Sequence, residues 1–293
     1  MDARVHYMNI VLALLAAPLI AQSTARDWAS LIGQRFTVER DVPYRSAGGM
    51  TLKLDYYVPY RKTPGPTVIY IHGGGWQTFS KEQTVLWYLP YIELGMRVIA
   101  VQYRLSGVAG APAGAEDCAC AIRYIYEHAA ERAVDPTRVL LTGGSAGGHL
   151  ALLTGFNAIE CPDHPGPLPR PAAILNYYGP TDLPTLEDTK ALKRWLRNAP
   201  VDGELARRLS PLNAVRSGLP PVLTIHGDAD EMVPYNQATR LHAALEKAGV
   251  PNRLVTIRGG HHGRHTWTDD DTLRAQREIE NFLVTHKILT ERN

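Results

Sequence analysis

Short apolar segments alternate with helical segments along most of this chain, and that alternation limits the fold more than any other feature. Residues 67–71 and 97–103 are almost entirely apolar, which is typical of parallel strands buried on both faces of a sheet. Helical patterns separate them, as in residues 113–132, where Ile122 and Ile125 fall on one face. The sequence therefore predicts an α/β fold with a mostly parallel central sheet and helices on both faces.

The other predicted elements follow the same alternation. The first pair of strands is expected to form a hairpin around Ala47-Gly48-Gly49. Residues 184–208 interrupt the pattern with charged helical sequence and predict a small cap insertion, whereas the prolines of residues 161–171 predict a surface loop. The remaining strands are expected at 36–42, 51–58, 138–142, 172–177, 221–226 and 253–257, and the remaining helices at 85–94, 149–155 and 273–286.

The first 25 residues have the layout of a secretory signal peptide. A weakly basic start precedes the apolar run 10–21, and Ser23 and Ala25 are small residues at −3 and −1 of a cut after Ala25. The run is shorter than the roughly 20 residues that a spanning helix needs. We therefore expect a leader at 1–25 and a mature domain at 26–293. The domain is expected to be periplasmic or secreted and to have no membrane partner after cleavage; a retained anchor is the alternative.

Charge and cysteine content exclude several protein classes. The chain has 31 Lys+Arg against 29 Asp+Glu, spread along its length, which argues against a nucleic-acid partner. Its 293 residues can form a large core, so folding needs no disulfide framework. Export permits disulfides, and three cysteines allow at most one internal pair. Cys118 and Cys120 face different sides of a helix and are not expected to pair with each other. The simplest interpretation is three thiols without a catalytic role.

A glycine-rich turn after the strand expected at 138–142 gives the first chemical signal. Gly143-Gly144-Ser145-Ala146-Gly147 matches G-x-S-x-G between a strand and a helix. A serine on such a sharp turn needs small neighbours, and the turn exposes its hydroxyl beside the first amides of the helix. No Lys follows the glycines, and the G-x-G-x-x-G spacing is missing, so phosphate and dinucleotide loops are disfavoured.

A second glycine loop follows the strand expected at 67–71. His72-Gly73-Gly74-Gly75-Trp76 contains three consecutive glycines, whose amides can point at one small anion without side chains in the way. An oxyanion hole requires this arrangement. His72 is interpreted as a structural hydrogen-bonding residue rather than as a base.

Acid and base candidates lie near the end of the chain. The segment 226–234, HGDADEMVP, follows one predicted strand, and 259–263, GGHHG, follows the next. A serine hydroxyl is a poor nucleophile until a base removes its proton and an acid orients that base. The order Ser, Asp, His along the chain is the order used when the serine lies on a strand-to-helix elbow.

Together these motifs resemble the α/β-hydrolase superfamily, in particular the HGGG-bearing esterase and lipase group related to hormone-sensitive lipase. The hairpin N-terminus, HGGGW and G-x-S-A-G-G-H-L are similar to its acetyl-xylan and feruloyl esterase-like branch. The hormone-sensitive-lipase branch has a longer helical cap and GDSAGG, where this chain has Gly144 in place of the Asp. The resemblance covers residues 36–286 and implies an α/β-hydrolase fold.

The resemblance also implies catalytic roles. Ser145 would be the nucleophile, and the amides of Gly74, Gly75 and Ala146 would form the oxyanion hole. No metal and no cofactor is implied.

The family acid is the Asp four residues before a Pro, which is Asp230 here, and Asp228 is then a turn former. The family base is the His directly before Gly, which is His262. His261 occupies a position that usually holds Gly, so the choice between the two histidines depends on this register.

Four further residues have roles that the resemblance suggests. Arg104 and Asp117 occupy positions that brace the fold in relatives and are expected to form an ion pair. Trp76 and Tyr103 are candidates for the wall of the substrate pocket, with buried packing as the alternative. Zinc is disfavoured because the histidines near residue 262 lack H-E-x-x-H spacing.

The sequence thus predicts a serine carboxylic-ester hydrolase that acts on a small-molecule or oligosaccharide ester. The small insertion favours short acyl groups, such as acetyl, and the resemblance favours acetyl or feruloyl esters of plant polysaccharide. The first alternative is another acyl hydrolase on the same fold, peptidase-like or arylformamidase-like. The second is a non-catalytic module similar to gibberellin receptors and neuroligins, which have lost a triad member, whereas this chain has all three.

Overall fold

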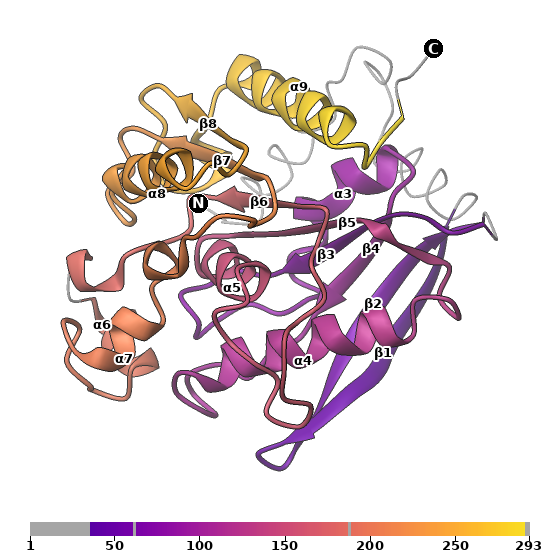
Figure 1. Ribbon diagram of the computed structural model, residues 1–293, viewed down its shortest axis with the longest axis horizontal. Helices are drawn as coiled ribbons and strands as arrows, with labels where there is room; N and C mark the ends of the chain where they lie inside the picture. Colours follow the sequence, from indigo (N-terminus) through magenta and orange to yellow (C-terminus); the bar gives the residue numbers. More distant parts are fainter. Residues whose placement is uncertain (1–35, 61–62, 187–188, 291–293) are drawn as a thin grey trace, which may run out of the picture.

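The computed structural model describes residues 36–60, 63–186 and 189–290, and these residues build one twisted sheet with helices on both faces (Figure 1). The described sheet has eight strands in the order β1-β2-β4-β3-β5-β6-β7-β8. β1 and β2 pair antiparallel, β2 also pairs antiparallel with β4, and all other pairs are parallel. The predicted mostly parallel sheet is therefore confirmed. The leader expected at residues 1–25 lies outside the described residues.

The strands match the apolar segments of the sequence closely. Every residue of β4 and β6 is buried, which explains why these segments show no polar alternation. The expected hairpin is also confirmed, because Gly48 and Gly49 both adopt positive φ in the turn between β1 and β2. The strands are β1 Phe36–Ala47, β2 Met50–Pro59, β3 Gly65–Ile71, β4 Arg97–Val101, β5 Val134–Gly144, β6 Ala173–Tyr177, β7 Val222–Gly227 and β8 Asn252–Ile257.

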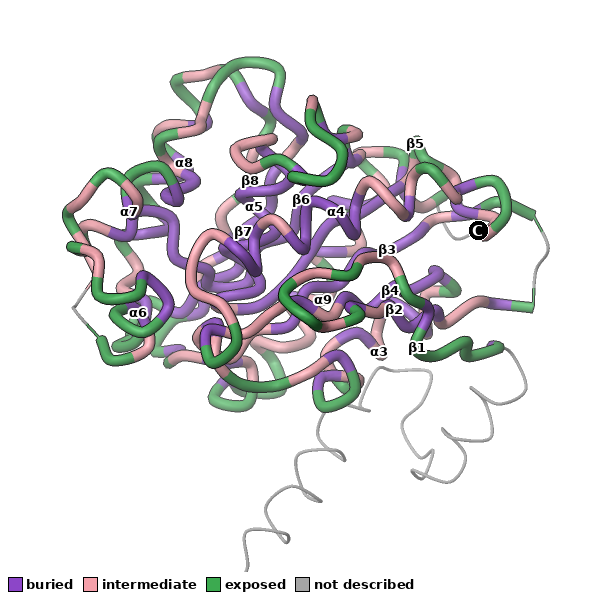
Figure 2. The backbone as a smooth tube through the Cα atoms, turned by 90° about the horizontal axis from the view of Figure 1, so that it is seen from below, coloured by how far each residue is buried: buried purple, intermediate pink, exposed green. Residues whose placement is uncertain are grey.

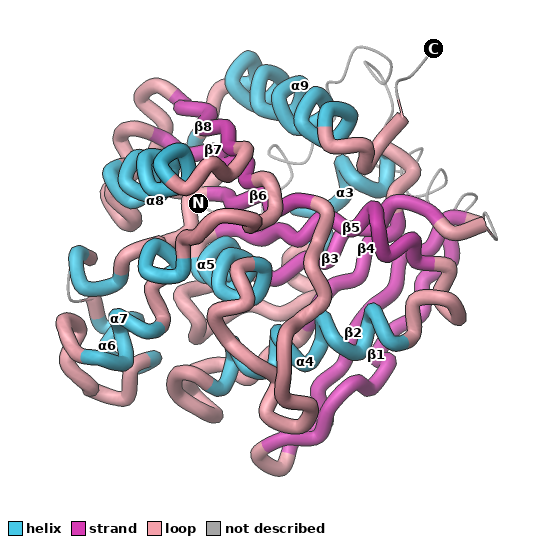
Figure 3. The backbone as a smooth tube through the Cα atoms, in the orientation of Figure 1, coloured by secondary structure: helices cyan, strands magenta, loops and turns pink. Residues whose placement is uncertain are grey.

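Helices divide between the two faces of the sheet (Figure 3). Ile69 and Ile71 of β3 pack into a cluster with α4, α5 and α8, whereas Val68 and Tyr70 pack into a second cluster with α3 and α9. Alternate strand residues thus serve opposite faces. The helices are α3 Val85–Glu93, α4 Ala113–Glu127, α5 Ala146–Gly155, α6 Lys190–Trp195, α7 Glu204–Arg208, α8 Asn236–Lys247 and α9 Asp269–Thr285, with short 3₁₀ turns at Leu183–Thr185, Pro211–Ala214 and Arg264–Thr266.

One helix and several element boundaries differ from the sequence-based expectation. Helix α8 is absent from the expected elements, although Leu241 and Leu245 bury one face of it. The expected helix 113–132 ends at Glu127, because the chain turns and passes Ala133 at positive φ before it enters β5. β5 then begins at Val134 rather than at 138, since Val134 already pairs with Gly65 of β3.

The insertion expected at 184–208 contains two short helices, α6 and α7, which lie beyond α5 at the left edge of the view in Figure 1. Leu192 and Trp195 of α6 and Ala206 of α7 are buried in the same cluster as α5. The apolar sides of α6 and α7 are therefore buried against the rest of the protein.

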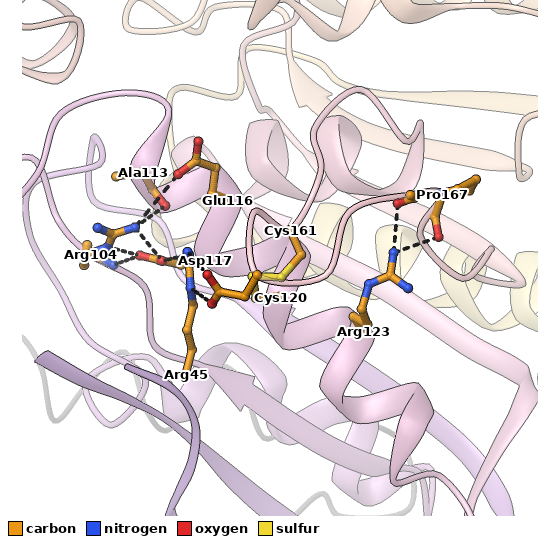
Figure 4. Close-up of a disulfide and its surroundings, with 11 residues drawn as sticks. Arg45, Arg104, Ala113, Glu116, Asp117, Cys120, Arg123, Cys161 and Pro167 are labelled. Carbon is orange, nitrogen blue, oxygen red and sulfur yellow. Dashed lines mark hydrogen bonds and ion pairs between the residues drawn. A yellow bond between two sulfur atoms is a disulfide. The ribbon is translucent and has the colours of Figure 1, made fainter. Parts of the chain in front are cut away.

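The sequence allowed at most one internal disulfide and left its partners open, and the structure has one, so two of the three cysteines are not thiols. Cys120 of α4 forms a disulfide with Cys161 (Figure 4). This bond links the loop after α5 covalently to α4. Cys118 is a buried free thiol. This disulfide holds the proline-rich loop expected at 161–171, and Leu168 of that loop packs beside it.

The ion pair expected between Arg104 and Asp117 is confirmed. Arg104 Nε lies 2.8 Å from Asp117 Oδ2, and Nη2 lies 2.9 Å from Oδ1. Arg45 of β1 also donates to Asp117 (Figure 4). A second hydrogen bond, from Arg45 Nε to Asp163, extends the network. Because the Asp117 side chain is fully buried, two guanidinium groups stabilise a charge that would otherwise be unfavourable there.

Figure 2 shows that buried residues run through the centre of the sheet, whereas most exposed residues lie in the loops and on the outer sides of the helices. Within the described ranges, no helix is long and apolar enough to cross a bilayer.

Candidate active site

Ser145 lies on a strained turn between β5 and α5. Its φ is 56° and its ψ −122°, a region that non-glycine residues seldom adopt. The flanking glycines are sterically required, because a Cβ on Gly143 would lie 2.4 Å from the Ile71 carbonyl oxygen and one on Gly147 only 2.1 Å from it. The Ser145 amide donates to the Tyr177 carbonyl at 2.8 Å. The backbone therefore holds the serine in one orientation at the carboxyl end of the sheet.

Three side chains from neighbouring strand ends form a hydrogen-bonded chain. His262 Nε2 lies 3.0 Å from Ser145 Oγ, and His262 Nδ1 lies 2.7 Å from Asp230 Oδ2. A carboxylate only accepts, so Nδ1 carries the proton and Nε2 is free to accept the serine hydroxyl. The loops after β7 and β8 supply the acid and the histidine. The structure thus brings together the three residues that the sequence nominated.

Asp230 is held as a carboxylate. Its Oδ1 accepts from the amides of Met232 and Val233 at 2.9 and 2.8 Å, and His226 Nε2 lies 3.3 Å from Oδ2. Burial acts to raise the pKa of Asp230, but the hydrogen bonds from His226, His262 and the Val233 amide outweigh it and hold the pKa well below its usual range. The acid is therefore ionised across the neutral range.

The adjacent His261 faces a different partner. Its Nδ1 lies 3.0 Å from Glu231 Oε2, and the side chain is 58% exposed. Asp228, expected to form the turn, accepts from the Gly259 amide at 2.6 Å and so joins the two loops. The two histidines are therefore clearly separated by geometry, with His262 alone directed at the serine.

The HGGGW loop lies directly beside the serine turn. A Cβ on Gly73 would lie 3.6 Å from Ser145 Cβ, and Gly74 and Gly75 have φ of 101° and 58°. The amides of Gln77 and Thr78 both donate to the Gly74 carbonyl at 3.0 Å, which closes the loop into a tight turn.

Ala146 is the first residue of α5, and the first amides of a helix have no partner within it. The glycine loop and the start of α5 thus both lie next to Ser145 in the chain or in space, and the oxyanion role of the Gly74, Gly75 and Ala146 amides stays a prediction.

Trp76 and Tyr103, the candidates for substrate contact, are both packed inside the protein. Trp76 is 5% exposed and stacks on Trp195 of α6 with ring centroids 4.5 Å apart. Tyr103 is 3% exposed, stacks on His72 and donates to the His72 carbonyl at 3.0 Å. Both positions fit the packing alternative, and a role in substrate contact stays a prediction. Burial lowers the pKa of His72 to about 4, so its ring is neutral at working pH.

The sequence reasoning missed His149, which links three parts of the site. Its Nδ1 accepts from Trp76 Nε1 at 3.3 Å, and its Nε2 donates to the Leu209 carbonyl at 2.7 Å. The ring is fully buried and lies edge-on to both Trp76 and Trp195. Burial lowers the pKa of His149 to about 4, which keeps this tautomer neutral. The sequence feature that could have indicated His149 is its position directly after the G-x-S-x-G-G segment.

The described residues offer no competing metal centre. The single group with metal-ligand spacing in that part of the chain is Cys120, Cys161 and Asp163, and its two sulfurs are bonded to each other. A disulfide sulfur is not a thiolate ligand.

Comparisons with known proteins identify the family of the chain. A BD-FAE family model matches residues 54–245, which is more than half of the chain. Esterase LipQ of Mycobacterium tuberculosis is 32% identical over 237 residues, or 76% of this chain, and the chain spans 56% of that protein's length. Among solved structures, this chain is similar to a truncated carbohydrate esterase from gut microbiota. The TM-score is 0.75 and the identity 25%, over 86% of this chain and 96% of the carbohydrate esterase.

A second solved structure is esterase 2 of the planctomycete Thermogutta terrifontis with bound propionate. The TM-score is 0.73 and the identity 27%, over 88% of this chain and 97% of the esterase. The family model, the strand order and the serine turn between β5 and α5 all lead to one assignment. The chain belongs to the BD-FAE family of the α/β-hydrolases.

Proposed function

We propose that the protein is a serine carboxylic-ester hydrolase. The observation that carries this proposal is the chain of hydrogen bonds from Asp230 through His262 to Ser145, beside the glycine loop of residues 73–75. The similarity to esterases supports it. Geometry, protonation and the strained turn all prepare Ser145 to attack a carbonyl carbon.

The reaction follows from these positions. Ser145 Oγ attacks the ester carbonyl while His262 Nε2 takes its proton, and ionised Asp230 stabilises the imidazolium. Amides of the HGGGW loop and of Ala146 hold the oxyanion. His262 then protonates the departing alkoxide, which leaves an acyl-enzyme. Water attacks this ester as His262 again takes a proton, and the carboxylic acid is released.

The proposed substrate is an ester of a short acyl group, with acetylated or feruloylated plant polysaccharide as the natural form. Helices α6 and α7 have only 6 and 5 residues, and a Cβ on Gly75 would lie 3.4 Å from Ala191 of α6. Such a short insertion, packed close to the glycine loop, leaves little room for a long chain. The propionate-bound and carbohydrate esterases that the chain resembles support the same size and class.

Turnover of a graded substrate panel tests this function. We expect p-nitrophenyl acetate, propionate and butyrate to be hydrolysed with higher kcat/KM than the octanoate and palmitate. We also expect release of acetate from acetylated xylan or of ferulate from methyl ferulate. Ser145→Ala is the control and should abolish all of these activities. Faster hydrolysis of emulsified long-chain triglycerides than of the short esters would contradict the proposed substrate class.

We also propose that the protein is exported. The signal-like layout of residues 1–25 and the Cys120–Cys161 disulfide support an oxidising compartment. Cell fractionation and N-terminal sequencing of the recovered protein test this. A mature protein that begins at Arg26 agrees with export, and an uncleaved chain confined to the cytoplasm contradicts it.

A further inference from the structure

Arg264 follows His262 by two residues and has an unusual environment for a cation. Its Cζ lies 4.6 Å from the centre of the Trp87 ring and 5.1 Å from that of Tyr177, so the guanidinium is held between two aromatic rings. Nη2 donates to the Trp87 carbonyl at 2.9 Å. Among the residues that the structure describes, no carboxylate pairs with this guanidinium within 4.0 Å. The rings and one carbonyl are thus its recorded partners.

Two residues that each have an unpaired N–H donor line one cavity beside this cation. Arg264 Nε and Trp267 Nε1 are both buried and have no hydrogen-bond partner. Both residues line a cavity of about 30 Å³ between α3 and α9. Trp267 is 9% exposed, so solvent hardly reaches its indole. Leaving two such donors unpaired is unfavourable, and a buried guanidinium without a directly paired carboxylate adds to the cost.

The size and polarity of the cavity restrict its occupant. A water molecule needs roughly 10–15 Å³ of such space, so the cavity has room for two or three waters or for one small ion. Two donors and a cation together call for an acceptor that carries negative charge. Glu280 of α9 lines the same cavity and is the one feature that opposes an anion.

We propose that the cavity between α3 and α9 binds a small monovalent anion of the chloride type, held by Arg264 Nε and Trp267 Nε1. The site adjoins the base: the Tyr178 ring lies 4.8 Å from the His262 ring and 6.1 Å from that of Trp267. An anion there links Arg264 and Trp267 and stiffens the segment that carries His262. This inference does not depend on the ester-hydrolase proposal, because its test is binding and stability.

Thermal unfolding in sodium chloride and in sodium gluconate at equal ionic strength tests the site. We expect chloride to raise Tm by about 2–4 °C with a saturating concentration dependence. Arg264→Gln and Trp267→Phe should each abolish the difference between the two salts. Glu280→Gln should lower the chloride concentration at which half of the maximal increase in Tm is reached. Glu278→Gln, on the same helix but outside the cavity lining, should leave the response unchanged.

Crystals grown in sodium bromide locate the ion directly. An anomalous peak within hydrogen-bond distance of Arg264 Nε and Trp267 Nε1 is the expected result. Equal Tm in chloride and gluconate, or density without anomalous signal, would overturn the proposal and leave water as the occupant. A chloride effect that persists in both Arg264→Gln and Trp267→Phe would also overturn it, since the ion would then bind elsewhere.

Discussion

His262 donates from Nδ1 to Oδ2 of Asp230 at 2.7 Å, and this one contact distinguishes His262 from the histidine beside it. The shared carboxylate fixes the tautomer of the ring, so that Nε2 faces Ser145 as an acceptor. His261 has turned to the exposed Glu231 instead. Adjacent residues in an extended loop end point to opposite sides, so only one of the two can serve as the base.

Substitution of the two histidines separates their roles. We expect His262→Ala to lower kcat by about 10⁴- to 10⁶-fold, to the level of Ser145→Ala. The double variant Ser145→Ala, His262→Ala should be little worse than either single change, because the three residues act as a unit. His261→Ala is the matched control and should keep most of the activity. If His261→Ala were inactive and His262→Ala active, His261 would be the base and the assignment of His262 would be wrong.

The acid side of the pH–rate profile depends on one protonation. The pKa of Asp230 is held well below its usual range, so this carboxyl stays ionised as the pH falls to mildly acidic values. Burial lowers the pKa of His72 and of His149 to about 4, so these rings stay neutral as well. Protonation of His262 therefore ends activity. We expect log kcat/KM for p-nitrophenyl acetate to fall with a slope of one on the acid limb. A slope of two would mean that a second group must lose a proton.

His149 is predicted to position the glycine loop through Trp76. Removal of the ring leaves Trp76 Nε1 and the Leu209 carbonyl without their partner and opens space between α5 and α6. We expect His149→Ala to lower kcat by about 10- to 100-fold with a smaller change in KM, because displaced amides stabilise the transition state less well. Trp76→Phe retains a ring to stack on Trp195 and should have a milder effect. Equal losses in kcat for both variants, with wild-type Tm, would contradict this division of roles.

The cysteine pairing can be counted directly. Without reductant, the denatured protein should show one reactive thiol, that of Cys118, and all three cysteines should react after reduction. The double variant Cys120→Ser, Cys161→Ser should lower the free energy of unfolding by up to about 4 kcal/mol in a loop-closure model, given the 41-residue separation. Cys118→Ser is the control that keeps the disulfide. Three thiols in the unreduced protein would rule the pairing out.

Local sequence patterns account for most of what could be predicted. Buried strands such as β4, whose residues after Arg97 are all apolar, form short continuous apolar runs that can be recognised in the sequence. Ser145 and its glycines are equally local, since the steric limits of one turn select them. Strand ends pointed to the two segments 226–234 and 259–263, and the resemblance to the α/β-hydrolases selected Asp230 and His262 within them; the structure joins these two residues.

Contacts between distant residues account for what could not be predicted. Trp76 and His149 are 73 residues apart, and no local pattern indicates that they share a hydrogen bond. The partner of Cys161 depends on how the loop after α5 folds back over α4. Helix α8 was missed for a different reason: its apolar positions, Leu241 and Leu245 among them, are diluted by charged and polar residues on its outer side.

Covalent labelling of Ser145 tests the central claim most directly. The purified protein is treated with an excess of diethyl p-nitrophenyl phosphate, and peptide masses and p-nitrophenyl acetate turnover are measured on the same samples. The account predicts one diethylphosphoryl group on the Ser145 peptide, a loss of turnover in proportion to labelling, and neither labelling nor turnover in Ser145→Ala. Turnover that survives complete labelling of Ser145, or wild-type turnover in Ser145→Ala, would contradict it.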